Sequence, residues 1–221
     1  MERLEELFID NLKIYQDDEK YCFTSDAILL SRFIDAKPYE VVADFCSGSG
    51  IVGLNFYALN KEKVKSVTLF ELQKSLFDLS MKSVKINGLE HIFDGVNGKI
   101  QEIDEKYKGA FSLILCNPPY IKKGCGYKIA DREIALCKVE EQLSLSELMV
   151  SVSFALKNGG RAVFCHRVDR ICDLFCEMRK NGIEPKQMQI VLSNENKPYL
   201  VLVEGVKGAK PGLKVLNNII N

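Results

Sequence analysis

The residue string Asn117-Pro118-Pro119-Tyr120 combines groups that can hold a planar amine. The Asn117 side-chain oxygen can accept a hydrogen bond from an exocyclic amino group, and the Pro118 carbonyl can accept the second amine hydrogen. The two prolines fix their φ angles, and the Tyr120 ring offers a face on which a base stacks. With both hydrogens held, the nitrogen lone pair turns toward an electrophile such as a methyl group on a sulfonium. The string therefore predicts methyl transfer to an amine.

A second chemical signal is the glycine-containing turn of sequence DFCSGSG, residues 44–50, which follows a short apolar strand. Glycines let the backbone approach a ligand, and the helix behind them aims its N–H groups at that ligand. Glu71 ends the next predicted strand about 20 residues later, where an acid hydrogen-bonds a ribose diol. The turn is neither GxGxxG nor a Walker loop, because a third glycine and a following Gly-Lys-Ser/Thr are missing. These residues predict an adenosyl-type ligand, and Asp44 suits a ligand that carries an ammonium group.

Predicted strands and helices alternate along the chain and must position these residues. Strands are predicted over 41–45, 64–71, 92–96, 111–116 and 161–166, and helices over 51–59, 75–87, 144–157 and 169–181, with another helix starting at residues 24–26. Two further strands, over 187–192 and 199–204, are predicted to form a hairpin. The pattern predicts an α/β fold, a doubly wound and mostly parallel seven-stranded Rossmann-like sheet with a C-terminal antiparallel hairpin. In such sheets ligands bind at the carboxyl ends of the strands.

The order of these motifs resembles the class I S-adenosylmethionine-dependent methyltransferases of amino groups. Three segments are further similar to the bacterial tRNA1(Val) adenine-37 N6-methyltransferases, whose target is an adenine in the anticodon loop: residues 15–30, the loop NPPYIKKGCG and the closing LVLVEGVKGAKPGLKVL. The resemblance runs from about Tyr15 to Leu216. We therefore expect a single methyltransferase domain over 1–221, with a capping segment 1–40, a Rossmann-like core 41–206 and a basic tail 207–221.

The resemblance implies a role for individual residues. The cofactor S-adenosylmethionine would be held by Thr24, Ala27, Asp44, Cys46, Gly48, Gly50, Glu71, Lys99, Ile100 and Asn117. The target adenine would be held by the catalytic residues Asn117, Pro118, Pro119 and Tyr120. Phosphates of the substrate RNA would be contacted by Lys122, Lys123, Lys207 and Lys210.

Two departures from this family's pattern weaken parts of the prediction. Many relatives carry an aspartate at the position of Lys99, where it accepts a hydrogen bond from the cofactor's adenine amine. A lysine side chain cannot accept, so this contact would be absent or supplied by the backbone of Lys99 or Ile100, a difference of about 1 kcal/mol. The second departure is Cys-Lys-Val-Glu at 137–140, where relatives often show Ala-Arg-His-Glu.

Other functions stay open at this stage. A glutamine N5-methyltransferase acting on a protein shares the catalytic string, but usually carries a helical N-terminal domain for which residues 1–40 leave no room. DNA adenine methylation usually needs a separate target-recognition region, and none is visible. A non-catalytic RNA-binding protein that retained the fold is favoured by Lys99 and opposed by the intact Asn117 to Tyr120.

The composition limits the kinds of binding partner and the cellular location that we expect for this protein. The chain has 30 basic and 30 acidic residues, and the acidic start with no long apolar run predicts a cytoplasmic protein without a membrane partner. Eight cysteines without a CxxC spacing and only two histidines predict reduced thiols and no metal site. The neutral total divides into −5 over residues 1–110 and +5 over residues 111–221. A local basic surface for tRNA is therefore compatible with zero net charge, and we expect a monomer.

Overall fold

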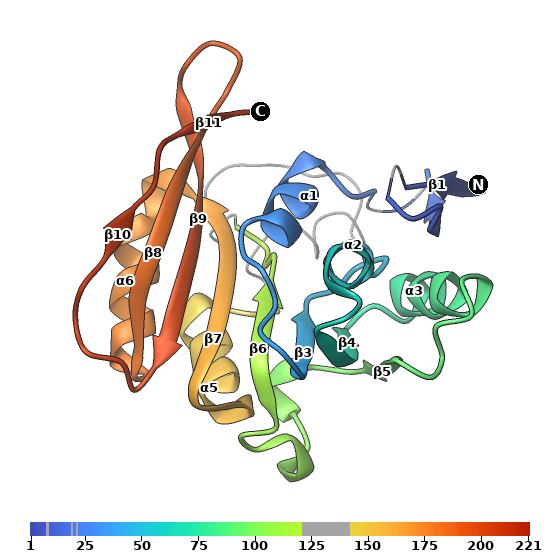
Figure 1. The fold of residues 1–221 in the computed structure, drawn as a ribbon, viewed down its shortest axis with the longest axis horizontal. Helices are drawn as coiled ribbons and strands as arrows, with labels where there is room; N and C mark the ends of the chain where they lie inside the picture. The colour runs from blue at the N-terminus through green and yellow to red at the C-terminus, as the bar shows by residue number, and fades with distance from the viewer. Residues whose placement is uncertain (8, 19, 21, 121–141) are drawn as a thin grey trace.

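The computed structural model describes residues 1–7, 9–18, 20, 22–120 and 142–221. These residues contain a nine-stranded sheet with the order β10-β8-β9-β7-β6-β3-β4-β5, and β11 pairs with β8 as well. Figure 1 shows this order from β10 on the left to β5 on the right. The strands are β3 (Glu40–Phe45), β4 (Val64–Glu71), β5 (Phe93–Asn97), β6 (Phe111–Cys116), β7 (Leu156–Arg167), β8 (Ile183–Leu192), β9 (Pro198–Lys207), β10 (Lys214–Val215) and β11 (Ile219–Ile220).

The strands β3 to β7 pair in parallel, as the alternation of strands and helices predicts. The central strand β6 is buried at all six positions, because helices cover both faces of a parallel sheet. The parallel pairing brings the carboxyl ends of β3, β4 and β6 to the same edge. The predicted doubly wound α/β sheet is confirmed, although the sheet of the described residues has nine strands where the sequence predicted seven.

The C-terminal hairpin is also confirmed, and it is longer than its apolar residues indicate. Strand β9 runs antiparallel to both β7 and β8, and so lies between them. The segment predicted to be a basic tail contains two short strands, β10 and β11. Both pair in parallel with the outer edge of β8. Backbone hydrogen bonds along an open sheet edge explain this pairing, which a glycine- and lysine-rich sequence does not reveal.

Helices cover the sheet in two layers. The helices α1 (Ser25–Arg32), α2 (Ile51–Asn60) and α3 (Lys74–Ile86) pack on one face, and α5 (Leu145–Ala155) and α6 (Ile171–Lys180) pack on the other. Three short 3-10 helices complete the described structure: η1 (Ile100–Glu102), η2 (Glu105–Tyr107) and η3 (Val168–Arg170). Ser144 caps α5 through a capping box with Glu147. Within the described residues, no helix is long and apolar enough to cross a membrane.

An N-terminal hairpin is the element that the sequence did not predict. Strands β1 (Glu2–Glu6) and β2 (Lys13–Asp17) pair antiparallel and are separate from the main sheet. The hairpin is hydrogen-bonded to α3 and to the residue that follows it. The Tyr15 N–H donates to Ser83 Oγ at 2.9 Å, and the Lys13 N–H donates to Asn87 Oδ1 at 2.9 Å. Isolated hairpins are marginal in water, so this one depends on contacts with a helix about 70 residues away.

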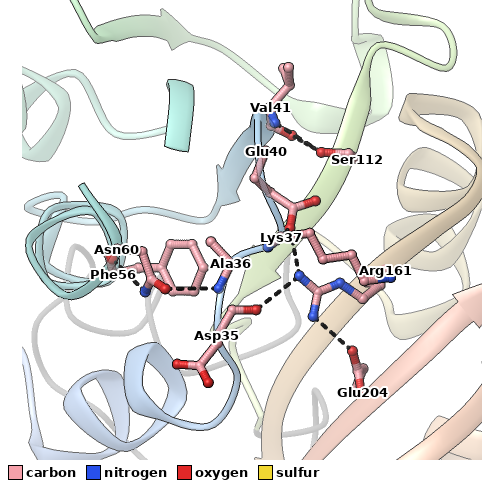
Figure 2. A network of polar contacts seen from close by, with 10 residues as sticks. All are labelled: Asp35, Ala36, Lys37, Glu40, Val41, Phe56, Asn60, Ser112, Arg161 and Glu204. Carbon is pink, nitrogen blue, oxygen red and sulfur yellow. Dashed lines mark hydrogen bonds and ion pairs between the residues drawn. The ribbon is translucent and has the colours of Figure 1, made fainter. Parts of the chain in front are cut away.

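A buried charge network ties the sheet to the segment that follows α1 (Figure 2). The Arg161 guanidinium of β7 donates to the Glu40 carboxylate at 2.6 Å, to Glu204 at 3.3 Å and to the Asp35 carbonyl at 3.0 Å. Arg161 and Glu40 side chains are only 9% and 3% exposed. Because desolvated charges are costly unless they are paired, each member of this network depends on the others.

Replacing Arg161 should therefore destabilise the fold strongly. In Arg161→Met the Glu40 and Glu204 carboxylates keep their burial and lose their countercharge, so we expect the free energy of unfolding to fall by about 3–5 kcal/mol. Urea denaturation followed by circular dichroism measures this loss. Arg179→Met is the matched control, because Arg179 forms a surface ion pair with Glu184 and its side chain is 59% exposed; its loss should stay within about 1 kcal/mol. Equal losses in the two variants would contradict the role given to the buried network.

Candidate active site

A cavity of about 520 Å³ opens at the carboxyl ends of β3, β4 and β6. The three segments that the sequence analysis expected to meet all line it: the turn after β3, Glu71 at the end of β4, and the string Asn117 to Tyr120 after β6. The capping segment supplies another wall through Thr24 and Ala27. Residues that are distant in the chain therefore share one site of the size that small cofactors occupy.

The glycine turn borders the cavity and contains several residues in the left-handed backbone conformation. Cys46, Gly48 and Gly50 have φ angles of 59°, 56° and 85°, a region in which glycine is free of strain. Gly48 lines the cavity, and a Cβ added there would meet no heavy atom within 4 Å. A Cβ on Gly50 would instead lie 3.1 Å from Ser80 of α3. Gly48 therefore has open space for a ligand, whereas Gly50 permits the close contact with α3.

Asp44 lies beneath this turn and is not among the residues that line the cavity. Its side chain is completely buried, and its Oδ2 accepts a hydrogen bond from the Gly53 N–H at 2.8 Å. The pKa of Asp44 is raised to about 8, mainly by burial and to a smaller extent by the nearby Glu71 carboxylate, against the effect of the Gly53 hydrogen bond. At neutral pH this geometry favours an uncharged Asp44 that holds the start of α2. The predicted contact with a ligand ammonium group gains no support from this position.

Glu71 connects the glycine turn to the second strand. Its carboxylate accepts the Gly48 N–H at 2.8 Å through Oε2 and the Gln73 N–H at 2.8 Å through Oε1. Glu71 is 6% exposed and lines the cavity. Burial raises its pKa, while the two backbone hydrogen bonds favour the charged form. The carboxylate keeps further lone pairs that a ribose diol can use, so the geometry is compatible with the predicted ribose contact.

Lys99 and Ile100 lie where β5 leads into η1, and both line the cavity. The Lys99 ammonium pairs with Glu102 at 3.3 Å, and the Lys99 side chain is 47% exposed. Ile100 is buried. The Lys99 ammonium is thus directed toward solvent and Glu102, and the choice between an absent contact and a backbone contact to the cofactor's adenine stays a prediction.

Gln16, which was not among the predicted site residues, links the capping segment to the glycine turn. Its Nε2 donates to Ser49 Oγ at 2.7 Å, and its Oε1 accepts the Phe23 N–H at 3.2 Å. Gln16 is 1% exposed, and a buried amide with both ends paired fixes its neighbours. The cavity wall also includes residues that were not predicted, among them Phe23, Asp26, Gln101, Gln142, Arg167, Asp169, Pro198 and Tyr199.

The string Asn117 to Tyr120 lines the cavity at all four positions. The Tyr120 hydroxyl donates to Asn117 Oδ1, so the acceptor expected for a substrate amine is occupied by a neighbour. The Tyr120 ring meets the His166 ring edge-on with 5.5 Å between centroids. Arg170 holds the Tyr120 carbonyl with a 3.3 Å hydrogen bond. The Tyr120 ring predicted to stack on a base therefore borders the cavity, and the Tyr120 hydroxyl is hydrogen-bonded to Asn117.

His166 lies behind Tyr120 and is not among the residues that line the cavity. It is fully buried, and burial together with the Arg170 charge lowers its pKa to about 4. The neutral ring therefore supports Tyr120 from the protein side. Among the described residues, no group of histidine, cysteine and acidic side chains is suited to a metal ion.

The predicted RNA-binding lysines fall in different places. Lys122 and Lys123 lie outside the described residues. Lys207 lies at the opposite end of the sheet from the cavity, where its ammonium donates to the carbonyl of Leu156, the first residue of β7, at 2.9 Å and also to Ser153. Lys210 is exposed beyond β9, and its carbonyl accepts from Lys186 at 3.1 Å. The position of Lys207 favours a structural role over contact with RNA at the cavity.

The unusual pKa of Asp44 predicts a pH dependence of stability. Its folded-state pKa of about 8 lies above its ordinary value of 3.8, so between these values the folded chain binds a proton that the unfolded chain has released. This contribution to stability is complete below about pH 4 and is lost as pH rises toward 8. Asp44→Asn mimics the protonated form, so we expect its free energy of unfolding to fall less than that of the wild type between about pH 5 and 8. Urea denaturation at both pH values measures this, and parallel curves would contradict it.

The chain is similar to two curated methyltransferases. It is 28% identical over 141 residues to the tRNA1(Val) (adenine(37)-N6)-methyltransferase of Shewanella putrefaciens, a match that covers 63% of this chain and 57% of that protein. It is 24% identical over 137 residues to a release factor glutamine methyltransferase of Clostridium botulinum, covering 59% of this chain and 47% of that protein. The chain thus spans about half the length of these relatives.

The fold is shared with a solved structure. A predicted O-methyltransferase from Agrobacterium tumefaciens superposes with a TM-score of 0.68 at 16% sequence identity, covering 88% of this chain and 86% of that chain. The class I methyltransferase fold expected from the sequence is therefore confirmed. The sequence profile of the methyltransferase small domain matches residues 23–144, a stretch that contains the glycine turn, Glu71 and Asn117 to Tyr120. Because this match covers more than half of the chain, the chain belongs to the methyltransferase small domain family.

Proposed function

We propose that this protein transfers a methyl group from S-adenosylmethionine to N6 of an adenine in a tRNA anticodon loop, with valine tRNA as the expected substrate. The observation that carries the proposal is the shared cavity of Asn117 and Tyr120 with Gly48 and Glu71. A base held by Asn117 and Tyr120 would meet a cofactor held by Gly48 and Glu71 inside this cavity. The similarity to the Shewanella putrefaciens enzyme supports tRNA as the substrate class.

The described residues fit the cofactor. Open space above Gly48 admits a ligand close to the backbone, Glu71 keeps acceptor capacity for a ribose diol, and Thr24 with Ala27 lies across the cavity. Lys99 and Ile100 form the remaining wall, where the adenine would lie. S-adenosylmethionine supplies an electrophilic methyl group on a sulfonium when it is bound.

The catalytic string would hold the nucleophile by hydrogen bonds and stacking. Asn117 Oδ1 and the Pro118 carbonyl accept the two amine hydrogens, which leaves the nitrogen lone pair free to face the methyl group. Tyr120 stacks on the base, a contact worth ~1–3 kcal/mol. The amine needs no general base before attack, because its proton becomes acidic only when the new nitrogen–carbon bond forms. An anticodon loop suits this site, because its bases unstack easily and are recognised singly.

Methylation of a protein glutamine amide is the alternative that a specific observation favours. The Clostridium botulinum relative is a release factor glutamine methyltransferase, and an amide nitrogen also presents two hydrogens to Asn117 and Pro118. Incubation with labelled cofactor, bulk tRNA and release factor distinguishes the two substrates. Nucleoside mass spectrometry identifies N6-methyladenine in RNA, and peptide mass spectrometry identifies methylglutamine. Label in the protein alone would refute the proposal for tRNA, and cofactor binding without label in either would favour a non-catalytic RNA-binding protein.

Asn117→Ala should lower turnover much more than it lowers the stability of the fold. The variant lacks an acceptor that orients the amine in the transition state, and we expect turnover to fall on the order of 10²-fold or more. The rate of N6-methyladenine formation in tRNA measures this loss, and circular dichroism with urea denaturation serves as the control for folding. Activity within a few-fold of the wild type would show that Asn117 does not position the amine.

Binding of tRNA should weaken steeply with salt. The three lysines at 122, 123 and 128 follow the catalytic string without an acidic residue among them. If they contact phosphates, affinity should fall at least about 10-fold between 50 and 200 mM salt, as measured by filter binding. Replacing Lys122 and Lys123 by alanine should reduce the salt slope. Lys207→Ala should leave it unchanged, because this ammonium donates to protein carbonyls. A slope reduced only by Lys207→Ala would reverse the assignment.

A further inference from the structure

The Gln16 side chain joins the N-terminal hairpin to two walls of the cavity. Its Oε1 accepts the Phe23 N–H at 3.2 Å, and its Nε2 donates to Ser49 Oγ at 2.7 Å and to the Tyr15 carbonyl at 3.3 Å. Phe23 and Ser49 both line the cavity. Gln16 is 1% exposed, so water does not compete for these hydrogen bonds.

The partners of the Gln16 amide fix its orientation. The Phe23 N–H can only donate, so it must face the Gln16 oxygen. The Tyr15 carbonyl can only accept, so it must face the Gln16 nitrogen. Ser49 lies on the nitrogen side and therefore accepts a hydrogen from Gln16. Because a hydroxyl has one proton, the Ser49 proton is directed away from Gln16 and is available to an acceptor in the cavity.

The position of Ser49 suits a negatively charged acceptor. Ser49 precedes Gly50, the N-cap residue of α2, and the first N–H groups of a helix attract anions. Ser47 lines the same cavity and is 3% exposed, and its hydroxyl has no hydrogen-bond partner among the described residues. A buried hydroxyl is costly unless it is paired. The two hydroxyls and the helix end together fit a carboxylate, which S-adenosylmethionine carries at its amino-acid end.

We propose that Gln16 is a positioning residue that turns the Ser49 hydroxyl toward the carboxylate of the bound cofactor. Gln16 is not among the residues that line the cavity, and it acts through Ser49. The N-terminal hairpin thereby takes part in cofactor binding. The inference rests on the proposed function for the identity of the cofactor, and it does not depend on which amine is methylated.

Calorimetric binding of two ligands tests this role. S-adenosylhomocysteine carries the amino-acid carboxylate, whereas 5′-methylthioadenosine keeps the adenosine and the sulfur but lacks the amino-acid end. In Gln16→Met the Ser49 proton is no longer directed into the cavity. We therefore expect the Kd of S-adenosylhomocysteine to rise about 5- to 10-fold, the size expected for one hydrogen bond. The Kd of 5′-methylthioadenosine should change by less than about twofold, because its contacts do not use this hydroxyl.

A double-mutant cycle shows whether Gln16 acts through Ser49. Ser49→Ala leaves the hydrogen bond between Gln16 and Phe23 in place, and it should weaken S-adenosylhomocysteine selectively in the same way. In the Ser49→Ala background, Gln16→Met should alter the Kd of S-adenosylhomocysteine by less than about twofold. Gln189→Met is the matched control, because this β8 amide donates to the Asn217 carbonyl at 2.9 Å in an exposed contact; it should leave both Kd values unchanged.

The outcomes separate this inference from a structural role and from the proposed function. Equal losses for the two ligands in Gln16→Met, or equal effects of Gln16→Met in the two backgrounds, would overturn it. An unchanged Kd of S-adenosylhomocysteine in Ser49→Ala would also overturn it, even if urea denaturation shows that Gln16→Met does not fold. A wild type that binds S-adenosylhomocysteine but methylates no tRNA would refute the proposed function alone, because calorimetry tests the Gln16 contact without methyl transfer.

Discussion

The active site depends first on the Glu71 carboxylate, which joins the ends of two parallel strands. By accepting the Gly48 and Gln73 N–H groups it holds the glycine turn of β3 against the end of β4. Asp44 supports the same turn from below through Gly53. Two acids in one buried region would repel each other if both were charged. The raised pKa of Asp44 relieves this repulsion, because a neutral Asp44 still accepts its hydrogen bond.

The second constraint is the closure of the capping segment over the strand ends. Gln16 ties this segment to the glycine turn, while the Arg161 network holds the chain after α1 against β7 and β9. Helix α1 is therefore fixed from both sides, and its first turn presents Thr24, Asp26 and Ala27 to the cavity. The capping segment is part of the site because these buried polar contacts position it.

Much of the fold follows from local sequence. The apolar runs of β3, β4 and β6 and the amphipathic stretches between them predict strands and helices, because parallel strands buried on both faces need apolar side chains. The order of the motifs also predicts that the glycine turn, Glu71 and Asn117 meet at one edge, since parallel strands place their carboxyl ends together. The N-terminal hairpin could not be predicted in this way, because α3 supplies partners for its backbone.

The sequence by itself determined the class of fold, the edge of the sheet that forms the site and the residue types that gather there. The tertiary structure decided which of those residues face the cavity. It placed Asp44 beneath the turn, Lys207 at the far end of the sheet and the Tyr120 hydroxyl on Asn117. Gln16 gained its role in the same way. The physical reason is that strand and helix patterns depend on neighbours in the chain, whereas burial, pKa and hydrogen-bond partners depend on groups that only folding brings together.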